Sequence, residues 1–258
     1  LLDASRNPHP RSAEALRRCR DAGVKVVLAS GRVALTMAPF AERIGLEPTF
    51  VCCNGAHVVD SEAGEVLHTP LPASAALAIL DFGRRRRLQT NLYFRDRIAF
   101  GFRSPFGDVY LSRVRFPVAE HVTKEEILRD SPTKMMVLAE PDELARHQPE
   151  AESLARSLGL RTVLSEPDYL EFLVPSADKG SGLRALCRRL GVPRELTAAV
   201  GDYSNDVEML QWAGLSAAMA NANEEAKAAA DLVVGSNDEG GVAEFVERFV
   251  LDRTASSE

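Results

Sequence analysis

The sequence predicts an α/β protein built on a Rossmann-like, doubly wound parallel sheet core, with an inserted α+β domain. Three observations lead to this fold class. Short β-branched runs alternate with helical patterns before Asn54, the same alternation returns after Pro175, and the stretch between them shows paired strands instead. A chain of 258 residues is long enough for one large domain that carries an insert.

The first part of the chain predicts a parallel βαβ unit. Its expected elements are a helix, a strand, a helix and a strand at residues 11–22, 24–30, 35–44 and 49–53. The run VKVVLAS is mostly apolar and β-branched, which is typical of a strand buried on both faces. Short links between these elements favour parallel strands joined by a crossover helix.

The middle block has a different pattern. It predicts a helix at 73–84, paired strands within 88–102, a strand at 133–140, a helix at 143–158, and strands in LRTVL and YLEFLV. This order favours an α+β module with one open sheet face. We therefore expect a cap domain at residues 71–175, inserted into a core domain formed by residues 1–70 and 176–258.

The last part returns to the parallel pattern. Expected helices lie at 179–190, 205–212, 224–229 and 242–249, and expected strands at 197–201, 215–219 and 232–234. Each apolar run is short and bounded by helical stretches, as in an open sheet covered by helices on both faces.

Composition narrows the class of function. The net charge is −6, from 31 basic and 37 acidic residues, which argues against a nucleic-acid-binding surface. No apolar run reaches the length of a membrane span. The cysteines show no metal-binding spacing and are expected to be buried free thiols of a cytoplasmic protein: Cys19, Cys52, Cys53 and Cys187. The sequence carries no signal of oligomeric state.

Polar clusters stand where predicted strands end and where a predicted helix begins. They are Ser30-Gly31-Arg32, Asn54-Gly55, Lys179-Gly180 and the segment from Asp202 to Asp206. Each is a weak signal alone, since a serine can cap a helix and Asn-Gly can form a hairpin turn. Ligands of open α/β sheets bind outside the carboxyl ends of the strands, so we expect these clusters to share one rim.

Together the clusters offer the chemistry of phosphoryl transfer. A hydroxyl, backbone N–H groups at a helix start and a lysine form a site for phosphate. Asp202 and Asp206 offer the carboxylate oxygens that Mg²⁺ prefers, together with phosphate oxygens and water. A purely structural alternative remains open, in which Asp202 caps the following helix and Asp206 complements its dipole.

Six segments then carry a resemblance to a known family. In order they are LASGR, CCNGA, DKGSGL, GDYSND, MANANEEAKAAAD and SNDEGGVA. With them the chain resembles the haloacid dehalogenase superfamily of phosphatases, specifically the Cof-like branch with a large α/β cap. The resemblance covers essentially the whole chain, and GDYSND followed by the MANAN segment is its most specific part.

The resemblance implies roles for the clustered residues. Ser30 and the Gly31 amide resemble the groups that hold the transferring phosphoryl group, and Lys179 resembles the lysine that neutralises nucleophile and phosphate. Asp202 is similar to the Mg²⁺ ligand of the family, and Asp206 to the acid that supports that ion indirectly, through a ligating group or through water.

The remaining roles concern orientation and substrate access. Asn205 is similar to the amide that orients phosphate and Lys179, and Asn221 to a residue that shapes the neighbouring loop. Three positions correspond to residues that line the substrate entrance: Arg32, Asn54 and Gly55. The middle block corresponds to the cap that closes over the site and selects the leaving group.

One departure from the family is serious. Members begin with an apolar strand that ends in a DxDGT motif, usually followed by Leu-Leu, and its two aspartates are the nucleophile and the general acid/base. This sequence opens at Leu1-Leu2-Asp3, where that motif should just have ended. Either the segment is truncated, or the chain is a natural non-catalytic relative. Truncation is favoured, because Lys179 and the two aspartates have little use without a nucleophile.

The sequence thus predicts a Mg²⁺-dependent phosphomonoester hydrolase of a small phosphorylated metabolite, acting through an aspartyl-phosphate whose aspartate lies upstream of Leu1. The alternatives are an inactive phosphate-binding relative and a phosphomutase on the same fold. For the polar residues of the cap strands, an exposed sheet face is favoured over substrate contact: Asn91, Tyr93, Arg95, Arg103, Lys134 and Glu171.

Overall fold

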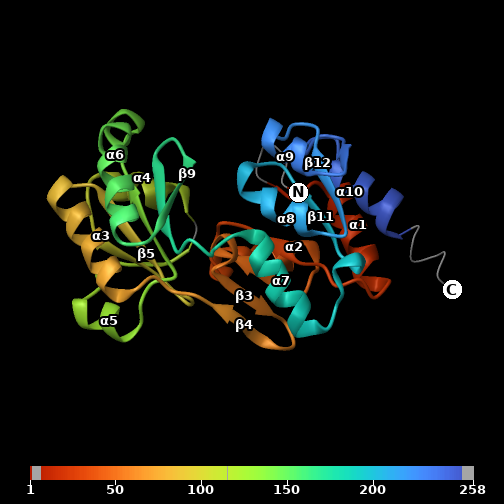
Figure 1. The fold of residues 1–258 in the computed structure, drawn as a ribbon, viewed down its shortest axis with the longest axis horizontal. Coiled ribbons are helices and arrows are strands. Elements are labelled where there is room, and N and C mark those ends of the chain that lie inside the picture. Colours follow the sequence, from red (N-terminus) through yellow and green to blue (C-terminus); the bar gives the residue numbers. More distant parts are fainter. Residues whose placement is uncertain (2–6, 115, 252–258) are drawn as a thin grey trace. The chain divides into compact units, whose positions relative to one another are not determined.

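A computed structural model describes residues 1, 7–114 and 116–251 of the chain. Leu2 and Asp3, which are expected to follow directly after the DxDGT motif, lie outside the described residues. The structure divides into two compact units, which we call the core unit (Leu1–Arg32, Thr36–Leu67 and Asp178–Glu258) and the cap unit (Val33–Leu35 and His68–Ala177). Figure 1 shows the elements of both.

The core unit holds two sheets. The first has the order β1-β2-β3-β4 and consists of Leu28–Ala29, Phe50–Cys52, His57–Asp60 and Gly64–His68. In it, β1 runs parallel to β2, and β2 runs antiparallel to β3. The second has the order β11-β12-β13, all parallel, and consists of Ala198–Gly201, Leu215–Met219 and Leu232–Val234.

The core unit also contains helices. They are α1 (Pro10–Asp21), α2 (Ala34–Ile44), α7 (Lys179–Leu190), α8 (Val207–Trp212), α9 (Glu224–Ala229) and α10 (Gly241–Phe245). Helix α7 packs on β2 and β3, α8 packs on β11 and β12, and α1 packs against α10. Short 3₁₀ segments lie at Cys53–Gly55 (η1), Arg194–Leu196 (η2) and Ser204–Asp206 (η3), and a π-helical segment at Val246–Leu251 (η4).

A large cavity separates the two core sheets. Its volume is about 1320 Å³. It is lined by Val26 and Leu28 on the side of β1 and by Ala199 on the side of β11. Leu186 of α7 and Phe245 of α10 also line it, so the surface is mostly apolar. In the part of the chain that the structure describes, β1 pairs only with β2 and β11 only with β12.

The cavity explains why the strand expected at 24–30 is recorded only at Leu28–Ala29. A ladder needs a partner, and β1 has one on a single edge. Its two residues are half-buried, whereas Phe50–Cys52 of the neighbouring β2 are fully buried. The apolar run therefore has the composition of a central strand and the exposure of an edge strand.

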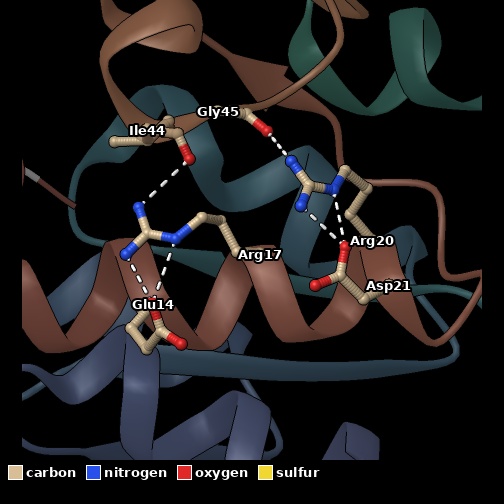
Figure 2. A network of polar contacts seen from close by, with 6 residues as sticks. All are labelled: Glu14, Arg17, Arg20, Asp21, Ile44 and Gly45. Carbon is tan, nitrogen blue, oxygen red and sulfur yellow. Dashed lines mark hydrogen bonds and ion pairs between the residues drawn. The ribbon is translucent and has the colours of Figure 1, made fainter.

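Arginines of α1 donate hydrogen bonds to backbone carbonyl oxygens at the end of α2 (Figure 2). Arg17 donates to the carbonyl oxygen of Ile44 at 3.4 Å, and Arg20 donates to that of Gly45. Each guanidinium also pairs with a carboxylate of α1 itself. The last carbonyls of a helix have no partner within the helix, so these contacts fix α2 against α1.

The cap unit holds one continuous sheet of six strands in the order β7-β6-β5-β8-β10-β9. The strands, in sequence order from β5, are Gln89–Tyr93, Ile98–Phe102, Val118–Ala119, Lys134–Leu138, Arg161–Glu166 and Tyr169–Leu173. Helices α3 (Ala73–Arg86) and α6 (Pro141–Ser157) pack on this sheet, and α4 (Phe106–Arg113) and α5 (Lys124–Arg129) complete the unit. All its pairs are antiparallel except β6 with β7.

The expectation that polar cap residues lie on an exposed sheet face is wrong for four of them. Asn91, Tyr93, Lys134 and Glu171 are at most 5% exposed. Lys134 Nζ lies 2.8 Å from Glu171 Oε2, and the Tyr93 hydroxyl lies 3.0 Å from that of Tyr110 on α4. The alternating pattern marked the polar side of the strands, but it could not show that a helix side chain covers that side.

The other two cap candidates lie in surface ion pairs. Arg95 is 3.5 Å from Asp130, and Arg103 is 2.5 Å from Asp108. Both arginine side chains are more than one third exposed.

The predicted fold class is confirmed: a parallel α/β core and a separate cap with an antiparallel sheet. The expected helix at 179–190, strand at 215–219 and helix at 224–229 have the same bounds in the structure. The hairpin β3–β4 and helices α4 and α5 were not predicted. The four cysteines are buried free thiols, as expected. Among the described helices, none has the length and apolar character that crossing a membrane requires.

Candidate active site

Two loops of the first core sheet are joined at its carboxyl end. The Ser30 N–H donates to Val51 O at 2.9 Å, which continues the β1–β2 pairing. The Asn54 N–H donates to Ser30 O at 3.1 Å, and the Cys53 N–H to Arg32 O at 2.9 Å. Ser30 Oγ accepts the Arg32 N–H at 3.2 Å, so this hydroxyl is held at the tip of a tight turn.

The start of α7 brings Lys179 to the same loops. Asp178 caps the helix, because its carboxylate accepts the Ser181 N–H at 2.6 Å while Ser181 Oγ accepts the Asp178 N–H at 3.4 Å. Gly55 has a φ of +95°, and a Cβ there would lie 1.9 Å from Asp178 O. Glycine at position 55 is therefore what allows the loop after β2 to touch the start of α7.

The segment GDYSND turns back on itself at the end of β11. Asp206 Oδ2 accepts the N–H groups of Asp202 at 3.0 Å and of Tyr203 at 3.1 Å. A Cβ on Gly201 would lie 2.5 Å from Asp206 Cβ, so the small residue at the strand end gives the carboxylate its place. Asp206 is 4% exposed, and its carboxylate holds the loop in shape by accepting these two backbone N–H groups.

Lys179 and Asp206 form a buried ion pair. Lys179 Nζ lies 2.6 Å from Asp206 Oδ1, and the two side chains are 7% and 6% exposed. Burial of both charges is costly unless they meet in good geometry, and here Asp206 also receives two backbone N–H groups. The pair places an ammonium group at the carboxyl end of β11.

Two asparagines extend this pair toward β2. Lys179 Nζ donates to Asn205 Oδ1 at 3.4 Å, and Asn205 Nδ2 donates to Asn54 Oδ1 at 3.0 Å. Asn54 has a φ of +52° and is 2% exposed. The contact joins residues 151 positions apart in the sequence.

Asp202 differs from Asp206 in being exposed to solvent. Its carbonyl oxygen accepts the Asn223 N–H at 3.1 Å, and Asn223 Nδ2 donates to Ser204 Oγ at 2.7 Å. Leu1, Asp202 and Asp206 all line the cavity between β1 and β11.

The donor set fits part of a Mg²⁺ site. Asp202 offers a solvent-facing carboxylate, which suits an ion that keeps several waters and uses one or two carboxylates. Both oxygens of Asp206 already have partners, which favours the supporting role over direct ligation. Among the residues that the structure describes, no group of three or more His, Cys, Asp or Glu side chains forms a complete metal site.

The structure brings most of the predicted site residues together. Loop contacts link Ser30, Asn54 and Gly55 to the start of α7, and side-chain contacts link Lys179 to Asn205. Arg32 stands apart, because its side chain is exposed and its guanidinium lies 5.2 Å from the centre of the Phe40 ring. The roles of all these residues, and of Gly31, remain predictions.

Comparison with known proteins identifies the family. A family model described as haloacid dehalogenase-like hydrolase matches residues 1–246. The chain belongs to the haloacid dehalogenase-like hydrolases. This confirms the family that the sequence motifs indicated, and the match spans both units of the hydrolase.

Curated relatives and solved structures agree with this assignment. The hydrolase is 28% identical to pyridoxal phosphate phosphatase YbhA of Escherichia coli strain K12, with 95% of this chain and 93% of the relative covered. It is 29% identical to 5-amino-6-(5-phospho-D-ribitylamino)uracil phosphatase YcsE of Bacillus subtilis, with 97% and 92% covered. The crystal structure of TM0651 from Thermotoga maritima superposes with a TM-score of 0.86 at 25% identity, covering 96% and 93%.

Sequence reasoning missed two residues that organise the site. Asp178 caps α7 one position before Lys179, and the spacing of Asp178 and Ser181 is a recognisable capping-box signal. Asn223 caps α9 through the Ala226 N–H at 3.0 Å and holds Ser204. The pattern Asn followed by Glu-Glu at a helix start could have identified it.

Proposed function

We propose that this hydrolase is a Mg²⁺-dependent phosphatase that releases phosphate from a small phosphorylated metabolite, such as a sugar phosphate. It acts through an aspartyl-phosphate whose aspartate stands before Leu1 in the complete protein. The observation that most supports this is the buried pair of Lys179 and Asp206, which holds an ammonium group between the start of α7 and the loop after β11.

The described residues supply a site for the phosphoryl group. Lys179 neutralises part of its charge, and Ser30 Oγ with the Gly31 N–H holds its oxygens. Phosphoryl transfer depends mostly on position and charge neutralisation, so a lysine held by two neighbours suits the reaction. Asn205, bonded to Lys179, contributes its amide to the same arrangement.

A metal ion completes the proposed site. When bound, Mg²⁺ supplies charge that offsets the phosphoryl oxygens. Asp202 is the residue that would hold it, and Asp206 keeps the Asp202 backbone in place through its Oδ2.

The cavity between β1 and β11 supports the proposed origin of the nucleophile. Each strand offers an unpaired backbone edge there among the described residues, and apolar side chains line the space between them. An apolar strand parallel to both would pair with the two edges, and its carboxyl end would reach Asp202. Leu1 and Asp202 line the same cavity, and we propose that a segment before Leu1 forms this strand.

The relatives support a small phosphorylated substrate. Their names specify pyridoxal phosphate and a phosphorylated ribitylaminouracil, which share a phosphomonoester on a compact polar molecule. The cap is the proposed selector of the leaving group.

An activity assay tests the proposal. The complete protein, with the residues that its gene encodes before Leu1, is offered a panel of phosphomonoesters with Mg²⁺ and with EDTA. We expect turnover that EDTA abolishes and that Asp202→Ala reduces by about 10²-fold or more. Absence of EDTA-sensitive turnover would contradict it and favour a phosphate-binding relative, and bisphosphate-dependent isomerisation would favour a phosphomutase.

A further inference from the structure

Asn54 connects the loops of the site in a way that the family roles do not describe. Its N–H donates to Ser30 O, its side chain lies against Gly31, and its Oδ1 accepts from Asn205. With a 2% exposed side chain, it is almost inaccessible to a ligand in solution. A residue that lines a substrate entrance would present its amide to that entrance instead.

The backbone around Asn54 is strained. Cys53 and Asn54 have φ values of +49° and +52°, so two consecutive non-glycine residues adopt the left-handed region. This conformation is unfavourable for residues with a Cβ, although asparagine tolerates it better than most. Such strain persists only where the surroundings enforce it, and it is concentrated at functional sites.

The hydrogen bonds give the two asparagine amides a fixed direction. Asn205 Nδ2 donates to Asn54 Oδ1 at 3.0 Å, which turns Asn205 Oδ1 toward Lys179 Nζ at 3.4 Å. An ammonium group has three N–H donors. Asp206 and Asn205 accept two of them from different directions, so the direction of the third is determined as well.

We infer that Asn54 is a positioning residue that acts through Asn205 to aim the Lys179 ammonium group at the phosphoryl group. The inference rests on the proposed phosphatase function. Asn54 touches neither substrate nor metal in this role. Its acceptor oxygen selects one of the two orientations of the Asn205 amide, and the other orientation would turn an N–H donor toward Lys179.

A set of variants of the complete protein separates the side chain from the backbone. Asn54→Gly removes the acceptor and relieves the strain, because glycine adopts positive φ freely. Asn205→Ala removes the amide that joins Asn54 to Lys179, and the double variant removes both asparagine side chains. Arg87→Gly is the matched control, since Arg87 also has a positive φ, of +58°, but is exposed at the end of α3 in the cap unit.

We expect Asn54→Gly to keep the wild-type melting temperature within a few degrees and to lower kcat by about 10- to 100-fold, with KM changed less than about threefold. Asn205→Ala should lower kcat by a similar factor, and the double variant by no more than the larger single effect. Arg87→Gly should leave kcat unchanged. Multiplicative losses in the double variant, a loss in KM rather than kcat, or an unaffected Asn54→Gly would overturn the inference.

A second readout does not depend on turnover. The affinity for orthovanadate, an analogue of the transferring phosphoryl group, is measured by calorimetry for the wild type and the same four variants. Unfolded molecules would lower the number of sites and not the affinity, so a non-additive fall in affinity identifies positioning. If the complete protein shows no turnover, the proposed function fails, and the orthovanadate cycle still decides the role of Asn54: additive effects, or no binding to the wild type, would contradict it.

Discussion

Among the described residues, each unit contains a lysine–carboxylate pair in which both side chains are buried and the N···O distances are similar. Lys179 lies 2.6 Å from Asp206 in the core unit, and Lys134 lies 2.8 Å from Glu171 in the cap unit. The surroundings differ. Asp206 sits in a loop at a strand end and also accepts two backbone N–H groups, whereas the cap pair links two adjacent strands in a continuous sheet.

The difference separates two uses of a buried charge. In the cap the ion pair is buried on a sheet face that it shares with Tyr93. Lys134 Nζ lies 4.8 Å from the centre of the Tyr93 ring. Such a pair can be replaced by apolar residues of similar volume at little cost. In the core the pair fixes an ammonium group next to a loop rim, and apolar replacements would fill the space without supplying the charge.

The largest expected effect comes from neutralising each pair in turn. K179M/D206N keeps one amide oxygen that can accept the Asp202 and Tyr203 N–H groups but removes the ammonium. We expect kcat to fall by at least about 10³-fold, or about 4 kcal/mol of transition-state stabilisation. The matched cap variant K134M/E171L should stay within about tenfold of wild type on a small aryl phosphate. Equal losses of kcat in the two variants would contradict the view that only the core pair serves turnover.

The second effect concerns stability of the cap pair. E171L alone leaves the Lys134 charge buried without its partner and should lower the free energy of unfolding by about 3–5 kcal/mol. K134M/E171L should recover most of that loss, to within about 1–2 kcal/mol of wild type. Urea denaturation with a probe in the cap measures both values. A double variant as unstable as E171L would show that the ion pair itself holds the cap sheet.

Asp60 is a third buried carboxylate, and it differs from the other two because a partly exposed lysine and backbone N–H groups donate hydrogen bonds to it. Burial alone would raise the pKa of Asp60, but hydrogen bonds from Lys25 and from the Ala63 and Glu62 N–H groups outweigh it and lower the pKa to about 2. A lowered folded-state pKa contributes stability above the ordinary value of 3.8, which is lost as the pH falls toward 2. D60N should therefore cost about 2 kcal/mol at pH 7 and flatten the stability profile between pH 4 and 2. If D60N lost stability between pH 4 and 2 as steeply as the wild type, this prediction would be contradicted.

The smallest effects come from two capping boxes, one in each unit. Asp178 caps α7 and Thr123 caps α5, each with a reciprocal contact three residues later. D178A and T123A should each lower the free energy of unfolding by about 1 kcal/mol. Only D178A should also reduce kcat, by about tenfold, because Lys179 is the next residue. Thermal unfolding and the phosphatase assay together check this pair.

Helix α7 shows what local sequence is able to predict. The expected helix at 179–190 has the observed bounds, because its ends are set by neighbouring residues: the Asp178 cap at the start and Gly191, at φ +68°, after the end. The polar clusters at strand ends were also readable, since the carboxyl ends of parallel strands share one edge.

Other features depend on contacts that local sequence does not encode. The run at 24–30 is only partly a strand, because a ladder requires a partner on the neighbouring edge. The link between Asn54 and Asn205 spans 151 positions, and nothing in either segment indicates the other. The burial of Asn91 and Glu171 could not be read from an alternating pattern, since that pattern shows which residues share a side and not what covers it.

The central proposal is that the described rim binds phosphate and metal, while the nucleophile stands on a strand between β1 and β11. Its most direct test compares phosphomonoester hydrolysis by two forms of the protein, one starting at Leu1 and one that includes the residues its gene encodes before Leu1. We predict Mg²⁺-dependent turnover by the longer form and none by the shorter form, even where circular dichroism shows the shorter form to be folded. Equal turnover by the two forms would contradict the account.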